Sequence, residues 1–131
     1  MTCMSRPCLL VVVALASGSL MGASCTARSI CNKSQECEEQ ENDRSFSDDA
    51  AAVCEVEYNA RINALNANEE DECHALADAI VALDNCRVGL KCDDFVEADL
   101  GGACDDESKA LSDAFDDVRG GFAGECSAQE N

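Results

Sequence analysis

The sequence predicts an all-α fold, a small disulfide-stapled bundle of about four to five helices. Its single proline, Pro7, lies close to the N-terminus, so no proline interrupts a helix in the rest of the chain. Helix-forming residues dominate, and no run alternates apolar and polar residues as a half-buried strand does. Eight cysteines along the body of the chain could form four cross-links: Cys31, Cys37, Cys54, Cys73, Cys86, Cys92, Cys104 and Cys126.

The predicted helices are separated by short polar or glycine-containing breaks. The first spans about 29–41 and is the least apolar. The second follows Ser47 as its N-cap and carries an apolar stripe to Leu65. The third begins at Asn68, and its apolar residues recur at spacings of three, four and three, the strongest amphipathic signal in the chain: Cys73, Leu76, Ile80 and Leu83.

Glycines delimit the C-terminal part of the bundle. Gly89 ends the third helix, and a short fourth element spans about 93–100. Two further glycines separate that element from a last helix at about 103–119. We expect the last helix to turn four residues inward: Cys104, Leu111, Phe115 and Val118.

The N-terminal residues have the layout of a secretory signal. Arg6 supplies a positive charge, the run 9–16 is apolar, and small residues lead up to Cys25. The uncharged stretch is shorter and more diluted than the roughly 20 apolar residues of a membrane-spanning helix. The sequence therefore predicts four segments: 1–24 as a signal peptide, 25–30 as a lipidated N-terminus and short linker, 31–126 as a cysteine-rich helical domain, and 127–131 as a disordered tail.

Cysteine parity distinguishes two ways of processing the signal. Simple secretion after a cut before Cys25 leaves nine cysteines, which cannot all pair. If Cys25 is instead lipid-modified, the remaining eight can pair completely. The segment 20–25, Leu-Met-Gly-Ala-Ser-Cys, resembles the lipobox of bacterial lipoproteins, although Gly22 stands where that family prefers leucine and the leucine lies at Leu20.

The resemblance implies a diacylglycerol anchor on Cys25 and a location at the cell envelope. The alternative is a secreted chain in which Cys25 is free, trimmed away or paired with another chain. The remainder of the sequence loosely resembles uncharacterised cysteine-rich helical lipoproteins of bacteria, a likeness that carries no functional motif.

Charge and composition limit the partners and the core. From Cys25 onward, eight basic residues stand against 27 acidic ones, which gives a net charge of −19. This charge disfavours nucleic acid and anionic lipid headgroups, so we expect a basic protein partner and membrane contact only through a lipid anchor at Cys25. Large apolar residues are sparse, and disulfides that each add about 2–4 kcal/mol can compensate for a thin core.

Helix geometry suggests part of the disulfide pairing. A hairpin that turns near Ser45 would place Cys37 level with Cys54, and this is the preferred bond. Cys31–Cys73 is a second, weaker expectation. The last four cysteines are expected to pair among themselves, in no preferred order. Eight cysteines allow 105 connectivities, so spacing cannot decide between them.

No catalytic, cofactor-binding or strong metal-binding motif is present. A nucleophilic pair of Cys73 with His74 would need a free thiolate in contact with its base. The cysteines also lack the short knuckles of a structural zinc site. The candidate residues for a weak cation or for a basic partner are three aspartates near the end of the last helix, where the helix dipole opposes them: Asp113, Asp116 and Asp117.

These observations favour a non-enzymatic, exported interaction or structural module of the cell envelope. The alternative is a secreted protein that binds a small apolar ligand or, weakly, a cation. An apolar-ligand protein would need a cavity of several hundred Å³. We would expect four residues to line it: Leu76, Ile80, Leu111 and Phe115.

Overall fold

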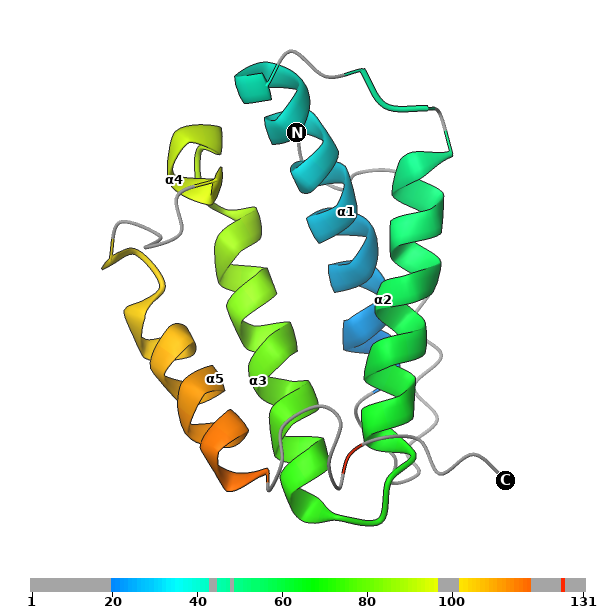
Figure 1. The fold of residues 1–131 in the computed structure, drawn as a ribbon, viewed down its shortest axis with the longest axis vertical. Helices are drawn as coiled ribbons and strands as arrows, with labels where there is room; N and C mark the ends of the chain where they lie inside the picture. Colours follow the sequence, from blue (N-terminus) through cyan, green and yellow to red (C-terminus); the bar gives the residue numbers. More distant parts are fainter. Residues whose placement is uncertain (1–19, 43–44, 48, 97–101, 119–125, 127–131) are drawn as a thin grey trace, which may run out of the picture.

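The computed structural model describes residues 20–42, 45–47, 49–96, 102–118 and 126 of the 131-residue chain (Figure 1). Within these ranges the chain forms five α-helices and no strand, which confirms the predicted all-α class. The helices are α1 (Leu20–Asn42), α2 (Ala50–Asn66), α3 (Asp71–Val88), α4 (Cys92–Val96) and α5 (Asp105–Asp117). None of the described helices combines the length and the apolar character that a membrane crossing requires.

Helix α3 lies in the middle of the bundle. Figure 1 shows α5 along one side of α3 and the hairpin of α1 and α2 on the other, with the short α4 at the C-terminal end of α3. Helix α3 packs against α1, α2 and α5, whereas α4 packs against α1. The central position follows from the stripe Cys73, Leu76 and Ile80, all of which are buried.

The buried residues form two clusters that meet at Tyr58. The larger joins α2, α3 and α5, and its most deeply buried large side chains are Ile62, Leu65 and Leu76. The smaller joins α1 to α4 through Ile30 and Phe95, together with buried cysteines. The half-buried Tyr58 packs against both clusters.

The first helix begins earlier than the sequence predicted. Residues 25–30, expected to be a linker, belong to α1, because Thr26, Ala27 and Ile30 are buried against the bundle. Of the other predicted segments, the tail 127–131 and residues 1–19 of the signal lie outside the described residues.

Two further predictions of local structure were wrong in detail. Helix α3 starts at Asp71 and not near Asn68, whose side-chain Oδ1 instead accepts a hydrogen bond of 3.0 Å from the Glu70 N–H. Ala114 of α5 and Val118, which follows the helix, are buried, whereas Phe115 is 37% exposed. The apolar face thus follows the spacing from Ala114 to Val118 and leaves Phe115 at its edge.

All eight cysteines predicted to pair do so, in four disulfides, and Cys25 is free and exposed. The bonds are Cys31–Cys54, Cys37–Cys92, Cys73–Cys126 and Cys86–Cys104. They connect α1 to α2, α1 to α4, α3 to the C-terminal segment, and α3 to the residue that precedes α5. Such cross-links persist in an oxidising, extracytoplasmic compartment.

The preferred bond Cys37–Cys54 was wrong because the hairpin is asymmetric. Helix α1 runs to Asn42, and its C-terminal end extends beyond the level at which α2 starts at Ala50 (Figure 1). Cys31 is therefore the residue of α1 that lies level with Cys54, while Cys37 reaches Cys92 at the start of α4.

The remaining pairing expectations were mostly wrong. Cys31–Cys73 does not form, because Cys73 joins Cys126. Of the last four cysteines only Cys86 and Cys104 pair with each other. The reason is that α4 packs against α1, which takes Cys92 away from its sequence neighbours.

Removal of a single disulfide should destabilise the fold more when the bond closes a longer loop. The sequence separations are 55 for Cys37–Cys92 and 18 for Cys86–Cys104. We expect C37S/C92S to lower the free energy of unfolding by about 4 kcal/mol and C86S/C104S by about 3 kcal/mol. Urea unfolding followed by circular dichroism measures both, and the reverse order would contradict the assigned connectivity.

Candidate functional site

One turn near the C-terminal end of α3 contacts every other helix or its first flanking residue. Successive residues of a helix point about 100° apart, so four consecutive side chains face four directions. Asp84 faces Tyr58 of α2, Asn85 faces Thr26 of α1, Cys86 is bonded to Cys104 before α5, and Arg87 covers Phe95 of α4. The segment 84–87 therefore combines polar, charged and sulfur contacts in one turn.

Two of these contacts fix the position of α1 and α4. The Thr26 hydroxyl donates a hydrogen bond of 2.8 Å to Asn85 Oδ1, and Thr26 is only 3% exposed. The guanidinium carbon of Arg87 lies 4.7 Å from the centre of the Phe95 ring, within the range of a cation–π interaction. Both are structural contacts, since each is satisfied within the bundle.

The pair Tyr58 and Asp84 is an unusual polar contact between the two clusters. The buried hydroxyl oxygen of Tyr58 lies beside the Asp84 carboxylate without a hydrogen bond of good geometry. Burial, and then the negative charge of Asp84, raise the pKa of Tyr58 above its usual range. Burial likewise raises the pKa of Asp84, against the opposing effects of Tyr58 and of Arg87, whose Nη1 lies 3.5 Å from Asp84 Oδ1.

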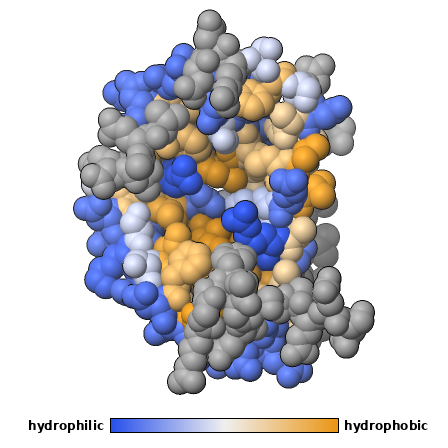
Figure 2. Space-filling view, in the orientation of Figure 1, coloured by the Kyte–Doolittle hydropathy of each residue, from blue (hydrophilic) through white to orange (hydrophobic). Residues whose placement is uncertain are grey.

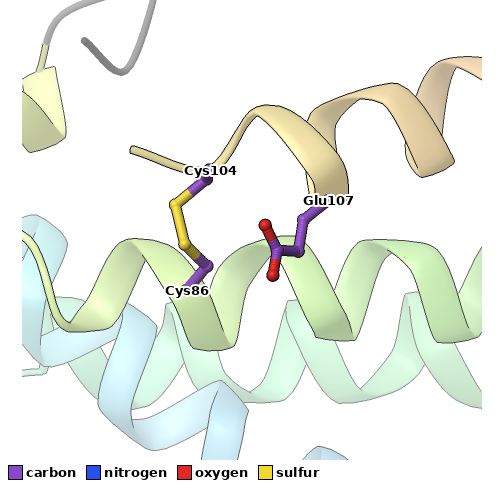
Figure 3. A group of neighbouring side chains, drawn as sticks. All are labelled: Cys86, Cys104 and Glu107. Atoms are coloured by element: carbon purple, nitrogen blue, oxygen red, sulfur yellow. A yellow bond between two sulfur atoms is a disulfide. The ribbon is translucent and has the colours of Figure 1, made fainter. Parts of the chain in front are cut away.

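A sulfur and carboxylate group lies on the other side of the same turn. Glu107 extends from the first turn of α5 toward α3, beside the Cys86–Cys104 disulfide (Figure 3). The two sulfurs and a carboxylate oxygen of Glu107 all lie within 4.8 Å of one another. Glu107 was not among the predicted site residues, because its place beside Cys86 depends on how α5 packs on α3. The spacing Cys104-x-x-Glu107 at a helix start was the available signal.

The predicted aspartates of α5 do not converge on a common point. Asp113, Asp116 and Asp117 are all exposed, and Lys109 Nζ donates to Asp113 Oδ2 at 2.6 Å. This contact raises the pKa of Lys109, first through the hydrogen bond and then through the charge. Among the described residues, none of these aspartates belongs to a group of three ligand atoms that lie as close together as the two sulfurs and the Glu107 carboxylate. They are an acidic surface and not a preformed cation site.

His74 closes the turn between α2 and α3. Its Nε2 lies 2.7 Å from the Asn68 carbonyl oxygen, and the side chain is half-buried. The neighbouring Cys73 is consumed by its disulfide with Cys126. The two residues therefore do not form a nucleophilic pair.

The residues expected around an apolar-ligand cavity do not line one: two are core residues, Leu111 packs against them, and Phe115 is exposed. Leu76 is fully buried and Ile80 is 8% exposed within the larger cluster, and Leu111 packs against them. A hollow of about 90 Å³ lies elsewhere, between α1 and α2 beside the Cys31–Cys54 disulfide. That volume is well below the ~300 Å³ at which small-molecule sites usually begin.

The outer face of α2 differs from the other surfaces. Val53 is 55% exposed and Val56 is 69% exposed, although both are large apolar residues. Figure 2, in the orientation of Figure 1, shows hydrophobic residues in the middle of the view and along its right-hand edge, the side on which α2 lies, with hydrophilic residues around most of the rim. Val53, Val56 and the exposed Ala60 recur at spacings of three and four, which places them on one stripe along the helix.

Replacement of Asp84 should reveal the cost of its burial. Since the folded-state pKa is raised above its ordinary value of 3.8, the protonated carboxyl is the form that the fold favours. The fold is therefore not destabilised by Asp84 in acid, where the carboxyl is protonated. The free energy of unfolding declines as the pH rises through the folded-state pKa of Asp84. We expect Asp84→Asn to melt higher than the unchanged protein at pH 7, with the difference vanishing below pH 3.8.

Thermal melts between pH 3 and pH 8 measure this effect. Asp78→Asn, which removes the same charge from the exposed face of α3, is the matched control. A lower melting temperature for Asp84→Asn at pH 7 would show that the contact with Arg87 outweighs the burial of the charge.

Comparison of the chain with protein-family models, with curated proteins and with solved structures found no match. The functional interpretation therefore depends on the surfaces and side-chain groups described above.

Proposed function

We propose that this chain is a non-enzymatic interaction module of the cell envelope, held outside the cytoplasm, that binds a protein partner through the outer face of α2. The observation that carries the proposal is the exposure of Val53 and Val56 on a helix whose other face is packed into the bundle. Large exposed apolar side chains at helical spacing are typical of a contact surface, since a helix that packs on one side only is otherwise polar on the other.

The distribution of charge supports the choice of α2. Counting exposed residues of the described helices, α1 carries one basic against three acidic side chains, α3 carries three acidic ones, and α5 carries one basic against five acidic. On α2 the exposed Glu57 is balanced by Arg61. In a protein of such negative charge, a neutral apolar stripe is the place where a partner can approach with the least electrostatic and desolvation cost.

The chemistry of the partner follows from the same surfaces. The stripe of Val53, Val56 and Ala60 fits an apolar ridge or an amphipathic helix, because a helix–helix seam needs apolar contacts every three to four residues. The surrounding surface is acidic, so basic side chains beside that ridge would complement it. We therefore expect a protein segment with an apolar stripe flanked by lysine or arginine.

Site-specific photo-cross-linking in the native envelope tests this surface. A photoreactive amino acid at Val56 should capture a discrete protein, whereas the same residue at Asp78, exposed on α3, should not. The double variant V53S/V56S should bind the captured protein at least about tenfold more weakly, since each buried valine contributes roughly 1.5 kcal/mol or more.

The controls separate binding from folding. Because both valines are exposed, V53S/V56S should keep the melting temperature of the unchanged protein within the small range usual for surface substitutions. Equal capture from positions 56 and 78, or unchanged affinity of the double variant, would contradict a binding role for α2.

A lipid anchor at Cys25 is the second part of the proposal. Cys25 is exposed and unpaired while the other described cysteines are bonded, which leaves its thiol available for acylation. The next two residues, Thr26 and Ala27, are already buried in the bundle. An acylated Cys25 would thus hold the domain directly against the membrane with no flexible tether.

Replacement of Cys25 should release the protein from the membrane. We expect Cys25→Ser to lose the mature form from the membrane fraction, because the variant lacks the thiol that would carry the acyl chain. Fractionation followed by immunoblotting measures this, with the melting temperature as a check that the fold persists. Unchanged fractionation would refute the anchor and leave a secreted or otherwise retained protein.

A further inference from the structure

We propose that an external dithiol opens the Cys86–Cys104 disulfide, and that the two thiolates then bind a thiophilic divalent cation such as Zn²⁺ together with the Glu107 carboxylate. This goes beyond the proposed function, because the site lies on α3 and α5 and shares no residue with the outer face of α2.

The positions of the three side chains carry the inference. Their ligand atoms lie within 4.8 Å of one another, and Figure 3 shows the carboxylate directed toward the disulfide. A tetrahedral zinc ion with Zn–S bonds of about 2.3 Å holds its sulfurs about 3.8 Å apart. The Cα atoms of Cys86 and Cys104 are 6.1 Å apart, the widest of the four disulfides, which leaves room for this separation.

The donor set suits a soft divalent metal. Two thiolates and one carboxylate provide three ligands and leave a fourth position for water, as in open zinc sites. Asp105 and Asp106, exposed in the same turn of α5, add negative potential around the ion. Binding would release the protons of the two thiols.

Accessibility favours opening of this bond over the two most buried ones. Cys86 is partly exposed, although its partner Cys104 is 1% exposed. In the bonds Cys37–Cys92 and Cys73–Cys126 both cysteines are at most 8% exposed. Cys54 is also partly exposed, but among the described residues the Cys31–Cys54 pair has no third ligand atom close enough to complete a site. Opening there would supply thiols without a metal site.

The dithiol supplies the two electrons and two protons that the thiol–disulfide exchange requires. One thiolate of the reductant attacks Sγ of Cys86, the S–S bond breaks, and its electron pair leaves on Cys104 as a thiolate. The second thiol of the reductant then displaces Cys86 from the mixed disulfide. The reductant is oxidised to its own disulfide, and the protein gains two electrons and two protons.

The fold should survive the opening. The bond closes the shortest loop of the four, with a sequence separation of 18. The larger cluster still joins α3 to α5 through Leu76, Ala114 and Val118. Cys86 therefore stays close to Cys104 and Glu107 after reduction, and this proximity is required for metal binding.

Cobalt binding to the full chain tests the proposal. The protein is treated with graded dithiothreitol, and differential alkylation with peptide mapping identifies which cysteines have opened. Under conditions that open Cys86–Cys104, we expect one Co²⁺ per chain, with a thiolate-to-cobalt charge-transfer band that Zn²⁺ abolishes. The fully oxidised protein should show no such band.

Glu107→Gln distinguishes the site from adventitious thiolate binding. This variant keeps every cysteine, so it should open at the same dithiol concentration but bind Co²⁺ roughly tenfold more weakly or worse. Asp106→Asn removes a neighbouring carboxylate that is not a ligand and should retain most of the affinity. Three results would overturn the proposal: no band although Cys86 and Cys104 are alkylated, equal affinity in Glu107→Gln, or failure of Cys86–Cys104 to open while the fold persists.

Discussion

Covalent cross-linking between helices is the constraint on which the rest of this structure depends. The chain from Cys25 onward carries a net charge of −19, and its largest fully buried side chains are a few aliphatic residues, Ile62, Leu65 and Leu76. Apolar burial of that size has little margin over conformational entropy and charge repulsion. The disulfides offset this by limiting the unfolded chain, and their loops overlap. Cys37–Cys92 and Cys73–Cys126 interlock along the sequence, so each half of the bundle is tied to the other.

The two buried clusters explain why α3 holds the central position. One cluster gathers α2, α3 and α5, the other gathers α1 and α4, and Tyr58 belongs to the rim of both. The turn 84–87 then distributes four different interactions over the four remaining helices. A buried charge at Asp84 is tolerated there because Arg87 and the Tyr58 hydroxyl lie beside it. The same turn places the partly exposed Cys86 beside Glu107 of α5.

The outer faces of the helices differ in charge and in the exposure of apolar side chains. The exposed charged residues of α1, α3 and α5 are mostly acidic, so these faces repel other anionic surfaces. The outer face of α2 is neutral and presents Val53 and Val56. A module with this arrangement would meet a complementary partner along one helix and repel other anionic surfaces. Because Thr26 and Ala27 are buried, the proposed anchor at Cys25 would orient that helix relative to a membrane.

The sequence by itself determined the helical class, the set of cysteines that pair, and the absence of a familiar catalytic motif, because these depend on composition, parity and local periodicity. Helix α3 was predictable from the stripe Cys73, Leu76 and Ile80, which its own spacing places on one face. The tertiary structure alone decided the disulfide partners. Cys37 meets Cys92 because α1 overshoots α2 and α4 folds against α1, and neither fact is local. It also decided that Glu107 lies beside Cys86 and that Val53 and Val56 face outward, since both depend on which side of each helix is packed against a neighbour.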